Sequence, residues 1–289
     1  MTVSDPSALV VAWYDANRRD LPWRADGVTP WGVLVSEIML QQTPAARVAP
    51  VWEQWLQRWP TPPSLAAEAP GEAVRMWGRL GYPRRALRLH EAATIITERH
   101  GGDVPGDHEA LLALPGIGSY TAAAVAAFGF GQRHAVLDTN VRRVHARLLR
   151  GEADATSSTP TVAERAEALA LVPDASPAKH SVAVMELGAL VCTARSPRCG
   201  SCPVVAMCAW HAAGRPDGAT HRKVQTYAGT DRQVRGRLLA VLRDSETDVT
   251  QPELDAVWHD PVQRARALAG LVTDGLVERV GAGRYRLPR

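Results

Sequence analysis

The chain has 289 residues, of which 46% are hydrophobic and 22% are charged, so it can bury a substantial core and is not disordered. No apolar run reaches the roughly 18 residues that a bilayer span needs, and the first residues, MTVSDPSALVV, lack a positively charged leader. We therefore expect neither a membrane protein nor an exported one. The net charge is only +3, yet 31 of the 33 basic residues are arginines; this bias suits phosphate contact, and a GC-rich genome would also produce it.

The first 225 residues are predicted to be mostly helical, because Ala, Leu and Arg recur at helical spacing between Pro and Gly breaks. The expected helices are Ser7–Asn17, Pro30–Leu40, Ala45–Arg58, Ser64–Ala69, Gly71–Arg79, Arg84–Arg99, His108–Leu114, Ser119–Phe128, Thr139–Leu149, Thr161–Ala170 and Lys179–Val191. The polar stretch Gly151–Pro160 indicates a loop, and His211–Thr226 indicates a linker.

The tail from Tyr227 has a different pattern. Three helices are expected at Asp231–Arg243, Gln251–Trp258 and Pro261–Thr273, followed by a hairpin of Leu276–Val280 and Arg284–Leu287 around a glycine turn. This order is typical of a winged helix, and about 60 residues give a marginal core, so we expect the tail to pack on the rest. Four tail arginines could contact phosphates or form a solvated face: Arg235, Arg237, Arg264 and Arg266.

A first candidate site lies in the segment Trp31–Thr43, WGVLVSEIMLQQT. On a helical wheel, Glu37 and Gln41 form the only polar stripe between two apolar sides. Apolar neighbours should raise the pKa of the Glu37 carboxyl by desolvation, which a general acid requires. The alternative is a partly exposed surface glutamate.

A second candidate is the turn Pro115–Gly118 within HEALLALPGIGSYTAAAVAAF. Two glycines between helices leave backbone N–H groups pointing outward at a helix N-terminus, where Ser119 follows, and such groups bind a phosphate. An ordinary helix–helix turn would use the same residues.

The helix in VLDTNVRRVHARLL begins near Asp138. Val141, Val144, His145 and Leu148 form the predicted buried stripe, and Arg142, Arg143 and Arg147 occupy other faces. Asp138 suits an N-cap, worth about 1 kcal/mol. A capping carboxylate is also kept ionised by the helix dipole and can therefore face a developing cation.

All four cysteines lie within 17 residues, and this spacing indicates a metal site: Cys192, Cys199, Cys202 and Cys208. Disulfides are disfavoured because cysteines two residues apart pair poorly. Zinc also takes four thiolates, but one CxxC flanked by single cysteines fits a loop around an iron–sulfur cluster better than paired zinc knuckles.

Taken together, these motifs resemble the helix-hairpin-helix DNA glycosylases, specifically the iron–sulfur adenine DNA glycosylases (MutY). The matching segments are LPWR (Leu21–Arg24), SEIMLQQT (Ser36–Thr43), GRLGY (Gly78–Tyr82), LPGIGSYTA (Leu114–Ala122), VLDTNV (Val136–Val141), MELGALVC (Met185–Cys192) and the cysteine loop, all in family order. The resemblance implies a 4Fe–4S cluster as the cofactor and double-stranded DNA with A:8-oxoguanine or A:G mispairs as the partner.

The resemblance also implies roles for single residues. Glu37 would protonate adenine N7 in a flipped-out nucleotide, and Asp138 would stabilise the oxocarbenium-like transition state. Tyr120 and Asn140 match positions that assist beside the sugar. Residues that match the adenine pocket, the base-stack wedge, the hairpin and the polar stripe are Arg24, Leu40, Gln41, Gln42, Tyr82, Gly116, Gly118 and Ser119.

One position discriminates the reaction type. Relatives that also nick the strand carry a lysine where this chain has Tyr120, and a Schiff base requires an amine. Neither Lys179 nor Lys223 lies in a matching motif, so a monofunctional enzyme that leaves an abasic site is expected. Glu37 argues against the thymine-excising relatives, which lack this carboxylate.

Some features depart from the family pattern. Pro83, Thr139 and Val182 replace a common tyrosine, a glycine and a polar base-contacting residue. The tail is too short for the Nudix-like domain that reads 8-oxoguanine, so the winged-helix-like unit would supply that contact or only non-specific affinity for DNA.

We therefore expect a mainly α fold of two lobes with a cleft between them. Residues 1–29 with 135–225 would form the cluster lobe, residues 30–134 the barrel lobe, and residues 227–289 the tail unit. Glu37 and Asp138 would face each other from opposite lobes in a cytoplasmic, nucleoid-associated monomer. The alternatives are a glycosylase that acts on T or U opposite G, and a DNA-binding protein without catalysis.

Overall fold

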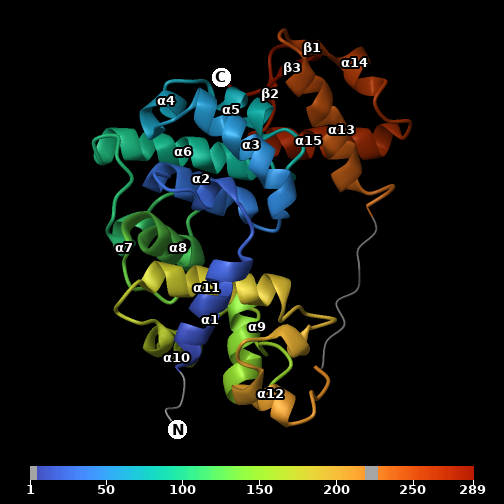
Figure 1. Cartoon of the computed structure of the whole chain (residues 1–289). Coiled ribbons are helices and arrows are strands. Elements are labelled where there is room, and N and C mark those ends of the chain that lie inside the picture. The colour runs from blue at the N-terminus through green and yellow to red at the C-terminus, as the bar shows by residue number, and fades with distance from the viewer. Residues whose placement is uncertain (1–4, 219–226) are drawn as a thin grey trace. The chain divides into compact units, whose positions relative to one another are not determined.

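The computed structural model describes residues 5–218 and 227–289 and is mainly helical, as predicted (Figure 1). Contacts divide the chain into two compact units. Unit 1 comprises the described residues of 1–30, 106–112 and 118–221, and unit 2 those of 31–105, 113–117 and 222–289. This division assigns the segment 118–134 to unit 1, whereas the sequence analysis placed it in the barrel lobe. In the described part of the chain, no helix combines the length and apolar character needed to cross a bilayer.

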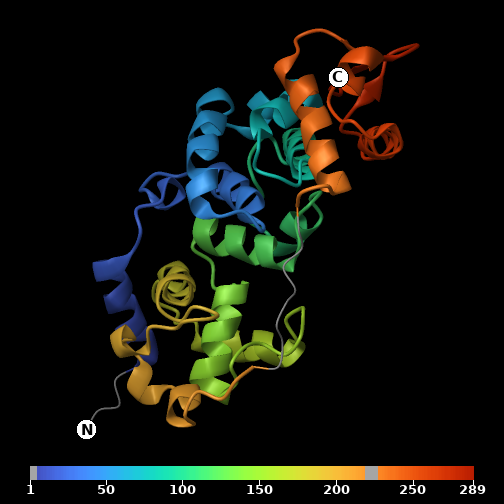
Figure 2. The same cartoon turned by 90° about the vertical axis from the view of Figure 1, so that its right-hand side faces the viewer.

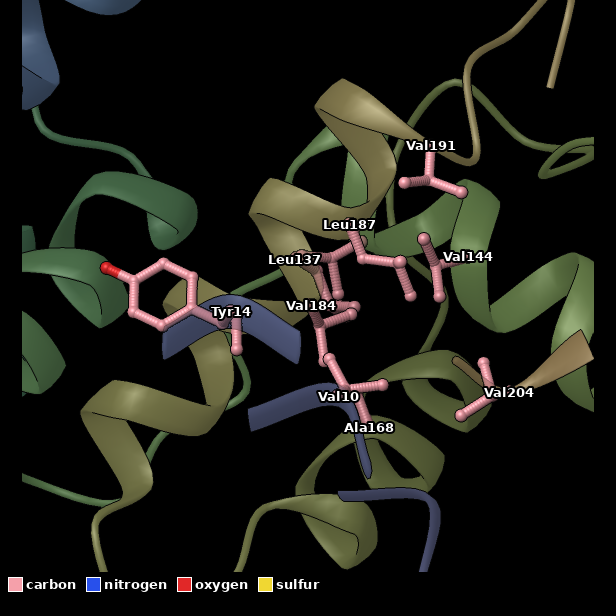
Figure 3. Close-up of a cluster of buried hydrophobic side chains, with 11 residues drawn as sticks. Val10, Tyr14, Leu137, Val144, Ala168, Val184, Leu187, Val191 and Val204 are labelled. Atoms are coloured by element: carbon pink, nitrogen blue, oxygen red, sulfur yellow. The ribbon is translucent and has the colours of Figure 1, made fainter. Parts of the chain in front are cut away.

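Unit 1 contains a large cluster of buried apolar side chains and a smaller one around Val136. Val10, Val141, Val144, Val184 and Leu187 are all buried in the larger cluster, and Figure 3 shows the side chains of Val10, Val144, Val184 and Leu187 gathered there. The elements of the unit are α1 (Pro6–Asn17), η1 (Pro22–Arg24), α7 (His108–Leu112), α8 (Ser119–Phe130), α9 (Thr139–His145), η2 (Ala146–Arg150), α10 (Val162–Leu171), α11 (Pro177–Leu190), η3 (Cys199–Ser201), η4 (Val205–Met207) and α12 (Ala209–Ala212).

Unit 2 is a helical bundle on which the tail packs. Its core includes the fully buried Trp55, Trp59 and Trp77, which meet edge to face. The bundle helices are α2 (Pro30–Leu40), α3 (Ala45–Arg58), α4 (Pro62–Ala66), α5 (Pro70–Trp77) and α6 (Arg84–Arg99). Pro30, the first residue of α2, is assigned to unit 1.

The tail folds as the predicted three helices and hairpin (Figures 1 and 2). Its elements are α13 (Asp231–Asp244), β1 (Val249–Thr250), α14 (Gln251–Asp255), α15 (Pro261–Thr273), β2 (Glu278–Arg279) and β3 (Arg284–Arg286). The sheet is antiparallel in the order β1-β3-β2, with Val249 opposite Tyr285 and Glu278 opposite Arg286. This is a winged-helix arrangement.

Local signals explain where the structure differs from the expected element bounds. The helix expected at Ser64–Ala69 begins earlier because Thr61 forms a capping box with Ser64 and prolines occupy the first helical positions. The helix expected at Thr139–Leu149 is α-helical only to His145 and continues as the π-helix η2. Strand β1 was missed because two residues carry no alternation. The expected linker 211–226 falls outside the described residues from 219 onward.

Candidate functional site

Glu37 lies on α2, and every residue of that helix from Trp31 to Met39 is buried. The glutamate is 5% exposed, so the alternative of a surface side chain is wrong. Two indoles hold the surrounding backbone: Trp52 Nε1 donates to the Gly32 carbonyl at 2.8 Å, and Trp31 Nε1 donates to the Trp59 carbonyl at 3.0 Å. Glu37 is therefore a carboxyl group withdrawn from water on a rigid helix.

Two of the residues expected to contact DNA have a positive backbone φ angle. Gln42 lies in the turn directly after α2, and Tyr82 lies in the Gly78–Tyr82 loop. Gln42 has φ of 57° and Tyr82 has φ of 49°, a region that side-chain-bearing residues rarely adopt. Such conformations persist only where the surroundings impose them, and they concentrate at functional sites. Tyr82 is 51% exposed and Gln42 is also exposed, so both side chains are available to a partner.

Arg85 connects these two turns, and the sequence analysis missed it. Its guanidinium donates to the carbonyls of Ile38 (2.9 Å) and Met39 (3.2 Å), and it also bonds the Gln41 carbonyl. The same group donates to the Gly81 carbonyl at 3.1 Å and lies 5.3 Å from the centre of the Tyr82 ring. Burial lowers the pKa of Arg85 to about 10. Only the run of two arginines after Tyr82-Pro83 could have suggested this residue.

Asp138 is the N-cap of α9, as predicted. Its carboxylate accepts from the Val141 backbone N–H at 2.6 Å and from Asn140 Nδ2 at 2.8 Å. Burial raises the pKa of Asp138 above its ordinary value, and these hydrogen bonds work in the opposite direction. The carboxylate is thus oriented by its own helix and is poorly solvated.

A network of hydrogen bonds fixes Asn140 behind this carboxylate. Its side-chain oxygen accepts from Arg143 Nη2 at 2.7 Å, and the same nitrogen donates to the Gly188 carbonyl at 2.8 Å. Gly188 on α11 must remain a glycine, because an added Cβ would lie 2.7 Å from the Asn140 Cβ. Close packing of α9 on α11 therefore sets the position of Asp138.

Tyr120 lies at the start of α8 and packs against a small apolar cluster that includes Ala123, Val136 and Met185. Val136 precedes Asp138 by two residues, so this packing brings Tyr120 to the segment that leads to the acid. Asn140 contacts Asp138 directly, and Tyr120 lies in the same unit.

The turn before α8 has the expected backbone. Gly116 has φ of 78°, and an added Cβ would lie 3.0 Å from the Arg88 Cβ. Gly118 is the N-cap of α8, no side chain caps this helix, and Gly118 and Ser119 are exposed. This arrangement suits a phosphate at the helix N-terminus.

Arg24, expected in the base pocket, makes an ion pair that was not foreseen. Glu186 on α11 is fully buried and accepts from Arg24 at 3.0 Å and from Arg19 at 2.7 Å. Although burial acts to raise the pKa of Glu186, the arginine hydrogen bonds lower it to about 2. Arg24 is therefore held by Glu186, which the matched segment MELGALVC contains but which sequence reasoning did not single out.

The four cysteines lie in one loop with only short 3₁₀ turns, and all four are free and partly exposed. Burial raises the pKa of Cys202 to about 11, and the neighbouring Cys192, Cys199 and Cys208 add to that rise. Deprotonation of several neighbouring thiols is thus disfavoured unless a positive centre is bound by them. Among the described residues, no group of three or more His, Cys, Asp or Glu side chains is arranged to hold a metal ion. The donor set is that of an iron–sulfur cluster.

Arg147 joins this loop to the helix that carries Asp138. Its guanidinium donates to Cys192 Sγ at 3.4 Å and to the Thr193 carbonyl at 2.8 Å, and the Cys208 thiol donates to the Arg147 carbonyl at 3.4 Å. Arg142, Arg143 and Arg147 are all buried, although they lie outside the predicted apolar stripe. Arg142 pairs with Glu164 at 3.1 Å.

The tail arginines are engaged inside the tail. Arg264 pairs with Asp255 at 2.9 Å, Arg266 pairs with Asp231 at 2.7 Å, and Arg235 pairs with Asp274. Arg237 lies 5.0 Å from the centre of the Trp258 ring. Arg235, Arg264 and Arg266 therefore contact acidic side chains within the tail, while Arg237 and Arg266 also remain exposed to solvent.

Two family models match the chain. One is described as HhH-GPD superfamily base excision DNA repair protein and matches residues 35–170. The other is described as the iron–sulfur binding domain of endonuclease III and matches residues 192–208, the four-cysteine loop. The fold and the loop thus define an iron–sulfur helix-hairpin-helix protein.

Curated relatives identify the family within the class of iron–sulfur helix-hairpin-helix proteins. The chain is 56% identical over 279 residues to the adenine DNA glycosylase of Mycolicibacterium smegmatis, covering 96% of this chain and 94% of the relative. It is also 56% identical to the enzyme of that name from Mycobacterium tuberculosis, over 99% of this chain and 94% of the relative. The human protein of that name is 41% identical, over 69% of this chain and 38% of its own length. The chain belongs to the adenine DNA glycosylase family.

Solved structures agree with this fold. A thermostable thymine-DNA glycosylase has a TM-score of 0.67 at 28% identity, covering 72% of this chain and 95% of that one. A trapped endonuclease III–DNA intermediate has a TM-score of 0.61 at 24% identity, covering 73% and 95%, and supports the fold alone.

Proposed function

We propose that this protein hydrolyses the N-glycosidic bond of adenine mispaired with 8-oxoguanine or guanine in double-stranded DNA and leaves an abasic site. The identity of 56% over nearly the whole chain to two adenine DNA glycosylases carries the proposal. The two acids supply the required chemistry, since this reaction needs a proton for the leaving base and an anion beside the sugar.

Glu37 is the proposed general acid. Its buried position on α2 excludes water, so its proton is delivered to adenine N7 rather than lost to solvent. Protonation converts a poor leaving group into a neutral base. Arg24 and Leu40 are proposed to bind the flipped adenine, and Gln41 belongs to the same turn.

Asp138 is the proposed stabiliser of the positive charge that develops on the sugar. Asn140 and the Val141 N–H hold its carboxylate in place before the substrate arrives, which is how electrostatic stabilisation is most effective. Tyr120 lies at the position where strand-nicking relatives carry lysine and offers no amine for a Schiff base, so water is the proposed nucleophile and the backbone is not cut.

Three parts of the chain are proposed to contact DNA. Gln42 and Tyr82 are proposed to enter the base stack beside the extruded nucleotide. Gly116, Gly118 and Ser119 are proposed to bind a phosphate at the start of α8. When bound, the cluster held by the four cysteines supplies a fixed centre that orders the basic loop with Arg195 and Arg198.

The mutual placement of Glu37 and Asp138 across a cleft remains a prediction, as do the monomeric state and a place at the cytoplasmic nucleoid. Both acids acting on one nucleotide requires that they meet around it. Crystals with a duplex carrying a non-hydrolysable adenine analogue would test this, and acids that both point away from the base would refute it.

The activity is tested with duplexes that contain A:8-oxoguanine, A:G, T:G or U:G, followed by alkaline cleavage of abasic sites. Release only from the adenine-containing mispairs is the expected result, and A:8-oxoguanine against A:G measures the mispair preference. Release of T or U would indicate a related glycosylase, and no release from any duplex would indicate DNA binding without catalysis. Strand cleavage before alkali would contradict the monofunctional assignment.

A further inference from the structure

An arginine of α5 and an arginine of the tail helix α13 each donate hydrogen bonds to carbonyls at the end of the other helix. Arg75 on α5 donates to the Ser245 carbonyl at 3.0 Å and also bonds the Arg243 carbonyl, both at the end of α13. In return, Arg243 on α13 donates to the carbonyl of Gly78, the residue that ends α5. Carbonyls at helix ends lack intrahelical partners and attract cations, so each helix satisfies the other.

A second contact between the tail and the bundle lies just after the Gly78–Tyr82 loop, which begins at the end of α5. Asp274, which follows α15, pairs with Arg84 at 3.4 Å, and Arg84 is the first residue of α6. The Gly78–Tyr82 loop is therefore bracketed by tail contacts on both sides. At the other end of α5, the Gly71 N–H donates to the Pro288 carbonyl at 2.8 Å, and an added Cβ at Gly71 would lie 2.5 Å from that oxygen.

The bracketed loop has a backbone that needs such support. Gly78 has φ of 54° and Tyr82 has φ of 49°. Inside the loop, the Gly81 carbonyl accepts from Trp77 Nε1 at 2.9 Å and from Arg85 at 3.1 Å. The Gly78 carbonyl is the point at which the tail, rather than the bundle, supplies the donor.

We propose that Arg243 is a positioning residue, by which the winged-helix tail holds the Gly78–Tyr82 loop so that Tyr82 is presented to the DNA base stack. The proposal rests on the proposed function, because it concerns the residue assigned there as a wedge. It gives the tail a role other than reading the opposite base.

The test uses the full-length protein with Arg243→Gln, Arg243→Lys and the matched control Arg266→Gln. Arg266 is also a tail arginine, but it pairs only within the tail, with Asp231. Two readouts are needed: the single-turnover rate of adenine release, and the fluorescence of 2-aminopurine placed next to the target adenine, which rises when the stack is opened.

Arg243→Gln is expected to lower the single-turnover rate by about tenfold, because misplacement by about 1 Å is costly to catalysis. It should also reduce the 2-aminopurine signal while the Kd for undamaged duplex is unchanged. Arg243→Lys should recover part of both, and Arg266→Gln should match the wild type. In a Tyr82→Ala background the same change should have no further effect, as expected for two residues acting through one contact.

A wild-type rate and signal for Arg243→Gln would overturn the proposal. Equal effects with and without Tyr82 would also overturn it, as would a rate loss accompanied only by a lower Tm. The 2-aminopurine arm reports stack opening without chemistry, so it still tests Arg243 if the wild-type protein releases no adenine. In that case the proposed function fails and the positioning role is judged separately.

Discussion

The two acids of the proposed site are held in different ways. Glu37 is in the middle of a helix whose neighbouring residues are all buried, and it is 5% exposed. Asp138 is at the beginning of a helix, where a backbone N–H and the Asn140 amide bond its oxygens. Burial raises the pKa of Asp138, and its hydrogen bonds from the Val141 N–H and Asn140 act in the opposite direction. The two acids thus differ in how they are held: Glu37 is enclosed by burial in the middle of α2, whereas Asp138 is oriented by capping the first turn of α9.

The substitution expected to have the largest effect on adenine release is Glu37→Gln. It keeps the shape of the side chain and removes the proton donor, so adenine release should fall by about 10²–10⁴-fold. Single-turnover release from an A:8-oxoguanine duplex measures the loss, and gel shift measures duplex binding, which should be unchanged. The exposed Glu91→Gln is the matched control and should behave as wild type. Retained activity in Glu37→Gln would remove the general-acid role.

Asp138→Asn is expected to have the next largest effect, about 10²–10³-fold on adenine release. The fold should survive, because asparagine caps a helix about as well as aspartate. Burial raises the pKa of Asp138, so the charged form is disfavoured in the folded state, and its contribution to stability is lost as pH rises through the folded pKa. At pH 7 the variant should therefore have an unchanged or higher Tm by circular dichroism. A Tm lowered by several degrees would show that the charge itself supports the helix.

The pH profile sharpens the difference between the acids. If Asp138 acts as an anion, the single-turnover rate of the wild type should fall as pH drops through its raised pKa. This fall in rate at low pH, the acidic limb of the profile, should begin at a pH above the ordinary pKa range of aspartate. It should be absent from Asp138→Asn, whose slow adenine release is followed over long times. The same acidic limb in both proteins would assign the titration to another group.

Asn140→Ala should have the smallest effect. It removes the hydrogen bond that Asn140 donates to Asp138 and the one that it accepts from Arg143. A hydrogen bond to a charged group is worth about 1.5–3 kcal/mol, so loss of the one to Asp138 should slow release by roughly tenfold or somewhat more. Because this bond favours the ionised carboxylate, its loss should raise the pKa of Asp138 further and move the acidic limb to higher pH. Asn17→Ala, which removes only a bond to the Trp13 carbonyl, is the control. An unmoved limb would show that Asn140 does not hold the acid.

Sequence reasoning succeeded where one local signal decides the structure. The bounds of the helices Pro30–Leu40 and Arg84–Arg99 were predicted as observed, and the Asp138 cap and the burial of Glu37 follow from a single helix pattern. The 4Fe–4S binding domain was confirmed because cysteine spacing is itself the signal.

The rest depends on contacts between distant residues. The spacing of apolar residues along the helix could not show that Arg143 and Arg147 are buried, because these arginines donate to carbonyls of residues 188–194. Arg85 and Glu186 act through turns and helices that no local pattern connects to them. The tail arginines looked available for phosphate until their acidic partners were brought close by folding.

One feature of α9 has a wider consequence. Its first turn is capped by Asp138, and the π-helical turn that continues it carries Arg147 against the cysteine loop. The loop that would bind the cluster and the acid proposed to act at the sugar thus lie at the two ends of one continuous helical segment. A cell starved of iron or exposed to oxidants that dismantle the cluster would lose the contact at one end of that segment, and its release of adenine from DNA would decline together with its metal supply.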